Sequence, residues 1–345
     1  EVWYSNDMGG DEYMPNVIPY LLARTLEHDA TASDLKRIYK IRDALSLLDF
    51  EDDSINTVRN FLLRCAMSPL YLRSKASTQG ILFLASLFSL HDRMMQPLHS
   101  TIKSQIPFAT DSQLRAYGLV YYQAWKQAEQ VWRETELAFK GSPKDLKEAE
   151  RNSLHARIEK NCLQEIVALA LYGKDKQTAR NSQVLLKMLS SRQADTGALL
   201  LRLWGPTLFR SLKAPNIRVR RNAARIFASV FPLTDPESKA QYVEKSIQFQ
   251  CGLMHEILAD DDAVVRTSAV ESVCRGLGLY WELLPSDEAG KLLKKIINDM
   301  ACDASSSSVR LAVVDGLRFM VENHLTHPVL KAVLPHTKKL FHDTA

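Results

Sequence analysis

Apolar side chains recur three or four positions apart along most of this chain, which is the spacing of one face of an α-helix. Three such segments align with one another: RVRRNAARIFASVF (218–231), VVRTSAVESVCRGL (264–277) and SVRLAVVDGLRFMV (308–321). Each contains a Val-Arg pair near its start, and successive pairs are 46 and 44 residues apart. The alignment predicts three copies of one structural unit.

A second amphipathic segment precedes each of these three segments, at 199–212, 242–258 and 289–302. The two segments form a pair, and the polar turns KAPN, ADDDA and DASSSS lie between the two segments of the first, second and third pair. Helix pairs that repeat every 40–47 residues or so are typical of HEAT and armadillo proteins. Such pairs stack because one pair alone cannot bury its apolar face. A further first helix is expected at 327–341, with its partner beyond Ala345.

The first half of the chain repeats less cleanly, but the breakers FEDD, SPL, PFATD and KGSPKD separate segments that also have helical periodicity. The segment 111–172 is expected to form two long antiparallel helices around the turn Gly141-Ser142-Pro143. The expected helices are 14–27, 32–48, 54–66, 76–90, 92–106, 111–138, 146–172 and 176–190.

No alternation typical of strands has useful length, so the chain is predicted to be all-α. The expected architecture is a HEAT-repeat α-solenoid, a superhelical stack of antiparallel helix pairs. Irregular N-terminal helical repeats are expected over 1–190, and regular HEAT repeats over 191–345, the last one truncated.

The composition, 46% apolar and 24% charged, is ordinary for a folded soluble domain. The five cysteines are odd in number and far apart, which favours free thiols in a reducing compartment. The longest apolar run, GILFLASLFSL (80–90), is too short to cross a bilayer. The opening EVWYSNDMGG has neither an initiator Met nor a signal peptide, so we expect a piece of a longer protein without a membrane anchor.

Few side chains are spaced as an active site would need. Cys251 with His255 and His324 with His327 lack the second pair that a zinc site requires. The acidic run 260–262 is interpreted as the cap of the following helix. Motifs for phosphate binding or for a serine nucleophile are missing. The sequence therefore predicts no enzyme, no metal, no cofactor and no small-molecule substrate.

Arg220, Arg266 and Arg310 occupy the same position in the three aligned repeats. A cation that recurs at each copy of a structural unit is expected to serve the structure. We therefore expect each of these arginines to form a structural inter-repeat ion pair with an acidic turn residue of the next repeat.

A second set of cations departs from the repeat pattern: Lys213, Arg218, Arg221 and Arg225. At the positions of its three arginines, the next repeat has Val264, Thr267 and Glu271, and the one after has Ser308, Leu311 and Asp315. The arginines are spaced three and four residues apart, so they share one helical face. The segment 187–225 holds nine Lys or Arg residues and one acid. A solvated basic face explains this pattern as well as a nucleic-acid site does; the hypothesis to test is that these four contact phosphates of duplex DNA without reading bases.

Three segments also resemble a known family: LFRSLKAPNIRVRRNAARIFASVFPLTDP (208–236), DDAVVRTSAVESVCRGLGLYWELLP (261–285) and SVRLAVVDGLRFMVENHLTHPVLKAVLPH (308–336). They resemble the HEAT repeats of the G-type regulatory subunits of condensin II. The run Phe-Pro-x-x-Asp-Pro and the triplet Tyr280-Trp281-Glu282 are not features of HEAT repeats in general. The resemblance is specific over about 198–345 and looser over 20–190.

This resemblance implies a non-catalytic scaffold that binds a kleisin subunit. Through the kleisin the scaffold would be linked to a pair of SMC ATPases and a second HEAT subunit. It further implies sequence-independent binding of duplex DNA, a role in mitotic chromosome condensation, and residence in the nucleus on chromosomes.

The alternative hypothesis is a HEAT-repeat adaptor for protein cargo or nuclear transport, without DNA binding. Such an adaptor would be expected to have acidic inner faces and ladders of aromatic or asparagine side chains. The basic middle third of the chain argues against this alternative.

Overall fold

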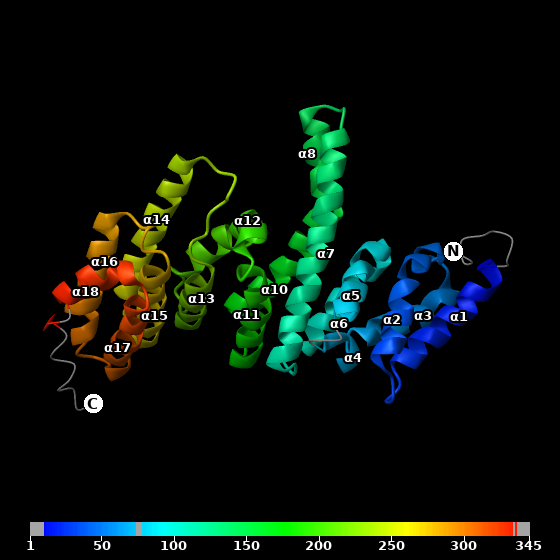
Figure 1. The fold of residues 1–345 in the computed structure, drawn as a ribbon, viewed down its shortest axis with the longest axis horizontal. Coiled ribbons are helices and arrows are strands. Elements are labelled where there is room, and N and C mark those ends of the chain that lie inside the picture. The colour runs from blue at the N-terminus through cyan, green and yellow to red at the C-terminus, as the bar shows by residue number, and fades with distance from the viewer. Residues whose placement is uncertain (1–9, 74–77, 334, 337–345) are drawn as a thin grey trace. The chain divides into compact units, whose positions relative to one another are not determined.

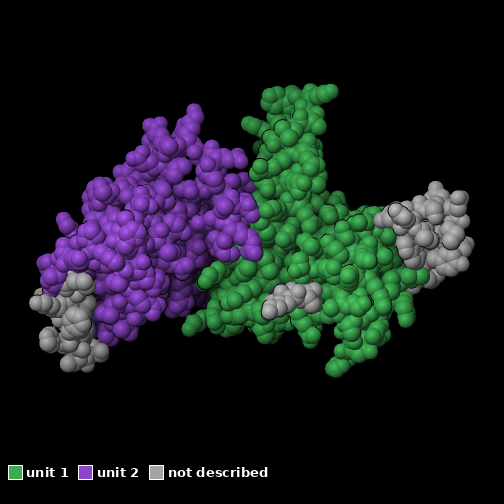
Figure 2. Space-filling view, in the orientation of Figure 1, with its two compact units in different colours: residues 1–189 green, residues 190–345 purple. Residues whose placement is uncertain are grey.

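The computed structural model describes residues 10–73, 78–333 and 335–336, and no strand occurs in these ranges. The prediction of an all-α helical repeat protein is confirmed. The chain divides into two compact units, 1–189 and 190–345 (Figure 2).

Unit 1 contains α-helices joined by short turns and 3₁₀ segments. They are α1 (Gly10–Thr25), α2 (Ala32–Lys40), α3 (Asn56–Cys65), α4 (Pro69–Leu72), α5 (Thr78–Leu90), α6 (Asp92–Gln105), α7 (Asp111–Ala138), α8 (Pro143–Asn152), α9 (Leu154–Ile158), α10 (Gln164–Tyr172) and α11 (Lys176–Ser190). The 3₁₀ segments are η3 (Arg42–Leu47) and η4 (Asp53–Ile55).

The structure corrects two of the expected helices. The helix expected over 146–172 is broken, because the Ser153 hydroxyl accepts a hydrogen bond from the Ala156 amide and so starts a new helix there. A π-helical segment, η5 (Glu159–Leu163), then separates α9 from α10. The helix expected over 32–48 ends at Lys40, and the chain continues as the 3₁₀ segment η3.

Helix α7 is the central helix of unit 1 and packs on α5 and α9. Between its N-terminus and its middle it buries Tyr117, Tyr121 and Trp125, which are among the largest fully buried side chains of the described residues. Its C-terminal half continues with α8 beyond the neighbouring helices of the unit (Figure 1). None of the residues of α8 is buried, so these two segments form a projecting arm.

Unit 2 consists of helix pairs whose members alternate between two layers. Its helices are α12 (Gln193–Ser211), α13 (Ile217–Val230), α14 (Ala240–Leu258), α15 (Ala263–Leu279), α16 (Ser286–Asn298), α17 (Ser307–Val321) and α18 (His327–Val333), with the 3₁₀ segments η6 (Met300–Cys302) and η7 (His324–Thr326). The second helices α13, α15 and α17 pack against one another, and α14 packs against α16 (Figure 1). Residues 337–341 of the last expected first helix lie outside the described residues.

The layer of second helices is held by the valines of the aligned repeats. Val265 and Val309 are fully buried, and Val219 is 7% exposed. Helices α15 and α17 lie in close contact at two glycines. A Cβ on Gly278 would lie 2.5 Å from the Phe319 carbonyl oxygen, and one on Gly316 would lie 2.6 Å from the Cys274 sulfur. Only glycine permits this backbone separation.

Candidate nucleic-acid interface

Helix α13 carries the arginines that the sequence singles out. The Asn216 side chain caps its N-terminus by accepting a hydrogen bond from the Arg218 amide at 2.9 Å. Val219, Ala223 and Phe227 are among the side chains that anchor the helix by burial. Ile217, Arg218 and Arg225 are exposed on the surface of unit 2.

Arg220 links two successive helix pairs. Its Nε lies 2.7 Å from Asp260 Oδ2 and its Nη2 lies 3.0 Å from Asp260 Oδ1, in the turn after α14. Its Nη1 donates to the carbonyl oxygens of Ala214 and Pro215, in the turn before its own helix. The hydrogen bond with Asp260 raises the pKa of Arg220, which stays charged.

Arg266 repeats this arrangement one helix pair later. Its Nε lies 2.8 Å from Asp303 Oδ2, its Nη1 donates to the carbonyl oxygens of Asp260 and Asp261, and its Nη2 donates to the Ser305 hydroxyl. Burial alone would raise the pKa of the Asp303 carboxyl. Hydrogen bonds from Ser305 and Arg266 outweigh burial and hold that pKa below its ordinary value.

Arg310 makes the third contact of the same kind, because its Nη1 donates to the Asp303 carbonyl oxygen at 2.7 Å. Its expected acidic partner belongs to a turn after 341, outside the described residues. Arg220, Arg266 and Arg310 thus bind the preceding turn of their own repeat, and the first two also bind the turn that follows. We call this series the arginine ladder.

Lys213, the cation in the turn before α13, forms an ion pair with the next helix pair. Its Nζ lies 2.7 Å from Glu256 Oε2 on α14. Both side chains are more than half exposed, at 56% and 55%. An exposed pair of this kind is screened by water and leaves the lysine available to a phosphate.

Arg218, Arg221 and Arg225 lie on one side of α13, away from the buried side chains. Arg218 and Arg225 are exposed and Arg221 is partly buried. The Arg221 Nε is buried without a hydrogen-bond partner in the described structure. Partial desolvation and the charge of Arg221 lower the pKa of Arg225, while Glu271 acts in the opposite direction. The side chains therefore crowd positive charge, and an anion would relieve that crowding.

A polar cluster around the buried His99 ring of unit 1 was not predicted from the sequence. The His99 ring lies between Tyr121, whose hydroxyl is 2.7 Å from Nδ1, and Glu165, whose Oε2 is 3.1 Å from Nε2. Lys103 Nζ is 2.6 Å from the same carboxylate oxygen. Burial lowers the pKa of His99, only partly offset by Glu165, so the ring is neutral. His99 and Tyr121 are fully buried, whereas the Lys103 and Glu165 side chains are 37% and 43% exposed, so this cluster joins α6, α7 and α10 between the core and the surface.

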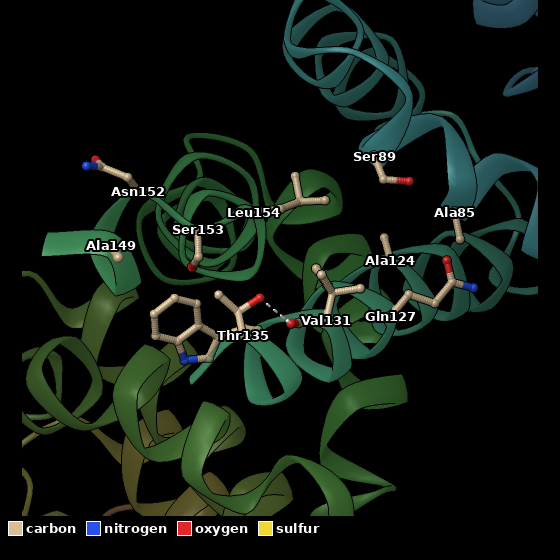
Figure 3. Close-up of a pocket in the computed structure, with 12 residues that line it drawn as sticks. Ala85, Ser89, Ala124, Gln127, Val131, Thr135, Ala149, Asn152, Ser153 and Leu154 are labelled. Carbon is tan, nitrogen blue, oxygen red and sulfur yellow. Dashed lines mark hydrogen bonds between the residues drawn. The ribbon is translucent and has the colours of Figure 1, made fainter. Parts of the chain in front are cut away.

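Within the described ranges, no group of three or more His, Cys, Asp or Glu side chains is placed to hold a metal ion. The described helices all fall short of the length or hydropathy needed to span a lipid bilayer. A hollow lined by uncharged side chains lies in unit 1, between α5, α7 and the junction of α8 with α9 (Figure 3).

Comparison with known proteins finds one family along this chain. The family model described as "Condensin II non structural maintenance of chromosomes subunit" matches residues 64–235, a range that includes the hollow and α13.

Three curated proteins, each named "Condensin-2 complex subunit G2", align with nearly the whole chain. The protein from Danio rerio is 30% identical over 349 residues, covering 100% of this chain and 28% of that protein. The one from Xenopus laevis is 28% identical, covering 100% and 28%, and the one from Homo sapiens is 30% identical, covering 94% and 26%. The chain thus spans little more than a quarter of the length of these relatives.

Proposed function

This chain belongs to the family of condensin II non-SMC subunits, and on that premise we propose that it binds duplex DNA through the basic face of α13. The residues that make the contact are Lys213, Arg218, Arg221 and Arg225. In this proposal they bind phosphates, which position the protein on DNA, and read no bases.

The observation that carries the proposal is the contrast between two sets of arginines on the same helix pairs. Those of the arginine ladder recur in each repeat and bind the turns of the scaffold. Arg218, Arg221 and Arg225 have no counterpart in the next repeat, where Val264, Thr267 and Glu271 support the same fold. Arginine suits phosphate because its planar fork can donate two hydrogen bonds to it.

In this proposal the chain is a regulatory subunit without catalytic activity. A kleisin subunit binds it and connects it with a pair of SMC ATPases and a second HEAT subunit. The assembly works on chromosomes in the nucleus during mitotic condensation. Family membership supports these partners and this location.

The test is a titration of labelled duplex DNA with the full-length protein, together with its kleisin, at two salt concentrations. Each phosphate contact contributes roughly −0.9 to the slope of log K against log salt. Changing Arg218, Arg221 and Arg225 together to Glu should weaken binding to all sequences alike and flatten the slope by about 3.

A matched control is available on α8, where Lys144, Lys147 and Arg151 are exposed and have the same spacing of three and four residues. Their triple change to Glu alters the net charge by the same amount, but in unit 1 rather than on α13. Equal losses of affinity in the two triple variants would reduce the effect to net charge and contradict the proposed site.

The kleisin partner is tested separately by co-expression of the full-length protein with fragments of a condensin II kleisin. Retention of one fragment through purification is the expected result. If the full-length protein retains none of them, the scaffold role fails even where DNA binding holds.

A further inference from the structure

The cations of the proposed DNA site have carboxylates of the next helix pair, α14 and α15, beside them. In the turn before α13, Lys213 Nζ lies 2.7 Å from Glu256 Oε2, which belongs to the last turn of α14. The two side chains are 56% and 55% exposed. Glu256 therefore binds a cation of the DNA site at the surface of unit 2, where a phosphate can approach the same ammonium group.

A second carboxylate, that of Glu271, lies beside the other end of the basic face. Helices α13 and α15 pack against each other (Figure 1), and the Ser272 hydroxyl donates to the Ala224 carbonyl oxygen at 3.1 Å. Arg225 and Glu271 are the residues directly next to this contact in the chain, and both are exposed. The charge of Glu271 also opposes the lowering of the Arg225 pKa. Glu256 and Glu271 thus act on opposite ends of the cation series.

The same boundary between helix pairs also contains an ion pair that is closed to DNA. Arg220 and Asp260 are 17% and 9% exposed, so a phosphate would have to displace a largely buried carboxylate to reach this guanidinium. An exposed ion pair is held much more weakly than a buried one, whose separated charges would lack both water and a partner. Of the two pairs, only Lys213 with Glu256 can therefore be exchanged by DNA at small cost.

We propose that the helix pair α14–α15 restrains DNA binding on α13, because Glu256 competes with phosphates for Lys213 and Glu271 repels phosphates at Arg225. This inference rests on the proposed function and names the residues that limit the affinity and the extent of its DNA site. Helices in contact lie about 8–10 Å apart, which is about one Debye length at 0.1 M salt. A phosphate on Arg225 is therefore only partly screened from Glu271. Since Glu271 has the repeat position of Arg225, it also ends the basic face at α13.

The test is a titration of labelled duplex DNA with the full-length protein and its kleisin. Glu256→Gln and Glu271→Gln each remove one charge and keep the shape of the side chain. Each should raise the affinity about two- to fivefold, the size expected for one exposed ion pair. The double variant should multiply the two gains, since the two carboxylates act on different cations.

Two exposed carboxylates of unit 2 provide matched controls. Glu244 lies on the same helix as Glu256, about 18 Å nearer its start at 1.5 Å per residue. Asp315 has the repeat position of Glu271, one helix pair further on. Glu244→Gln and Asp315→Asn change the net charge by the same amount and should alter the affinity less than about twofold. All of these variants should keep the thermal midpoint of the wild type, since the substituted positions are exposed.

Two further substitutions separate the parts of the restraint. In a Lys213→Met background, Glu256→Gln should gain no more than Glu244→Gln, because the cation for which carboxylate and phosphate compete is gone. Glu271→Arg continues the basic face onto α15 and should add one phosphate contact, which steepens the slope of log K against log salt by roughly 0.9. Asp315→Arg should leave the slope unchanged.

A glutamine variant that binds DNA no better than its control would overturn the restraint by that carboxylate. Weaker binding would also overturn it, because the carboxylate would then position its cation for DNA. A gain of Glu256→Gln that persists in full with Lys213→Met would overturn the competition. The triple change of Arg218, Arg221 and Arg225 to Glu is titrated alongside. If it weakens binding while the glutamine variants match their controls, the restraint alone fails; if it binds like the wild type, the DNA site fails and the restraint with it.

Discussion

Arg220 and Asp260 form a two-point ion pair across successive helix pairs, with Nε 2.7 Å from Oδ2 and Nη2 3.0 Å from Oδ1. The side chains are 17% and 9% exposed. Lys213 and Glu256, which join the same two helix pairs, are more than half exposed. The two contacts therefore differ in solvation more than in distance, and they should differ in what they contribute to stability.

Asp260→Ala should lower the free energy of unfolding by about 2–3 kcal/mol, because it leaves a largely buried guanidinium without its carboxylate. Glu256→Ala removes the exposed partner of Lys213 and should cost less than about 1 kcal/mol. Urea unfolding of both variants measures the difference. Equal losses would show that the burial of the Arg220 pair has no energetic consequence.

Val265→Asp should destabilise the protein by more than about 3 kcal/mol, because it buries an unpaired charge between α13, α15 and α17. Val264→Asp is the matched control, since Val264 is 43% exposed on the preceding position of the same helix. Thermal unfolding should separate the two variants clearly. A mutant at 265 as stable as the wild type would mean that the alignment of the repeats is wrong.

Gly316→Ala should cost about 1–3 kcal/mol, because the new Cβ would lie 2.6 Å from the Cys274 sulfur and would force α15 and α17 apart. The same substitution at Gly252 on α14 meets nothing within 4 Å. There the higher helix propensity of alanine should stabilise the protein by up to about 1 kcal/mol. Opposite signs in the two unfolding experiments are the expected outcome, and equal signs would contradict the close approach of α15 and α17.

His99 should make stability fall as the pH drops below about 6.5, the ordinary pKa of histidine. Burial lowers its pKa in the folded protein, so in that range the unfolded chain takes up a proton and the folded protein does not. The free energy of unfolding then decreases by at most about 1.4 kcal/mol per pH unit, until the folded pKa is reached. Unfolding curves at pH 6.5 and 5.5 should show a larger loss for the wild type than for His99→Gln. Equal losses would mean that His99 is already charged in the folded protein.

The regular repeats were predictable because their signals are local and recur. Asn216 and Asp262 each cap the helix that follows, as their positions before an apolar-periodic segment indicate. The position of Arg220 and Arg266 in the repeat indicated which side of each helix pair they occupy, and the structure places Asp260 and Asp303 there.

Contacts without a counterpart in the repeats could not be predicted in this way. Glu256 lies 43 residues after Lys213, and no copy of that pair recurs to reveal it. The break between α8 and α9 was missed for a related reason. It depends on Ser153, one hydroxyl in a segment that otherwise has helical periodicity.

The arginine ladder gives the two edges of unit 2 different mechanical properties. Along the ladder, each of the first two guanidinium groups binds two consecutive turns, so these turns cannot separate without breaking several charge-assisted hydrogen bonds at once. In the layer of first helices, α14 packs on α16 much less extensively than α15 packs on α17. A stack of helix pairs that is held firmly along one edge and more loosely along the other should bend when it is pulled. We expect tension on unit 2 in an optical trap to separate α14 from α16 first, with the turns of the ladder acting as the hinge line.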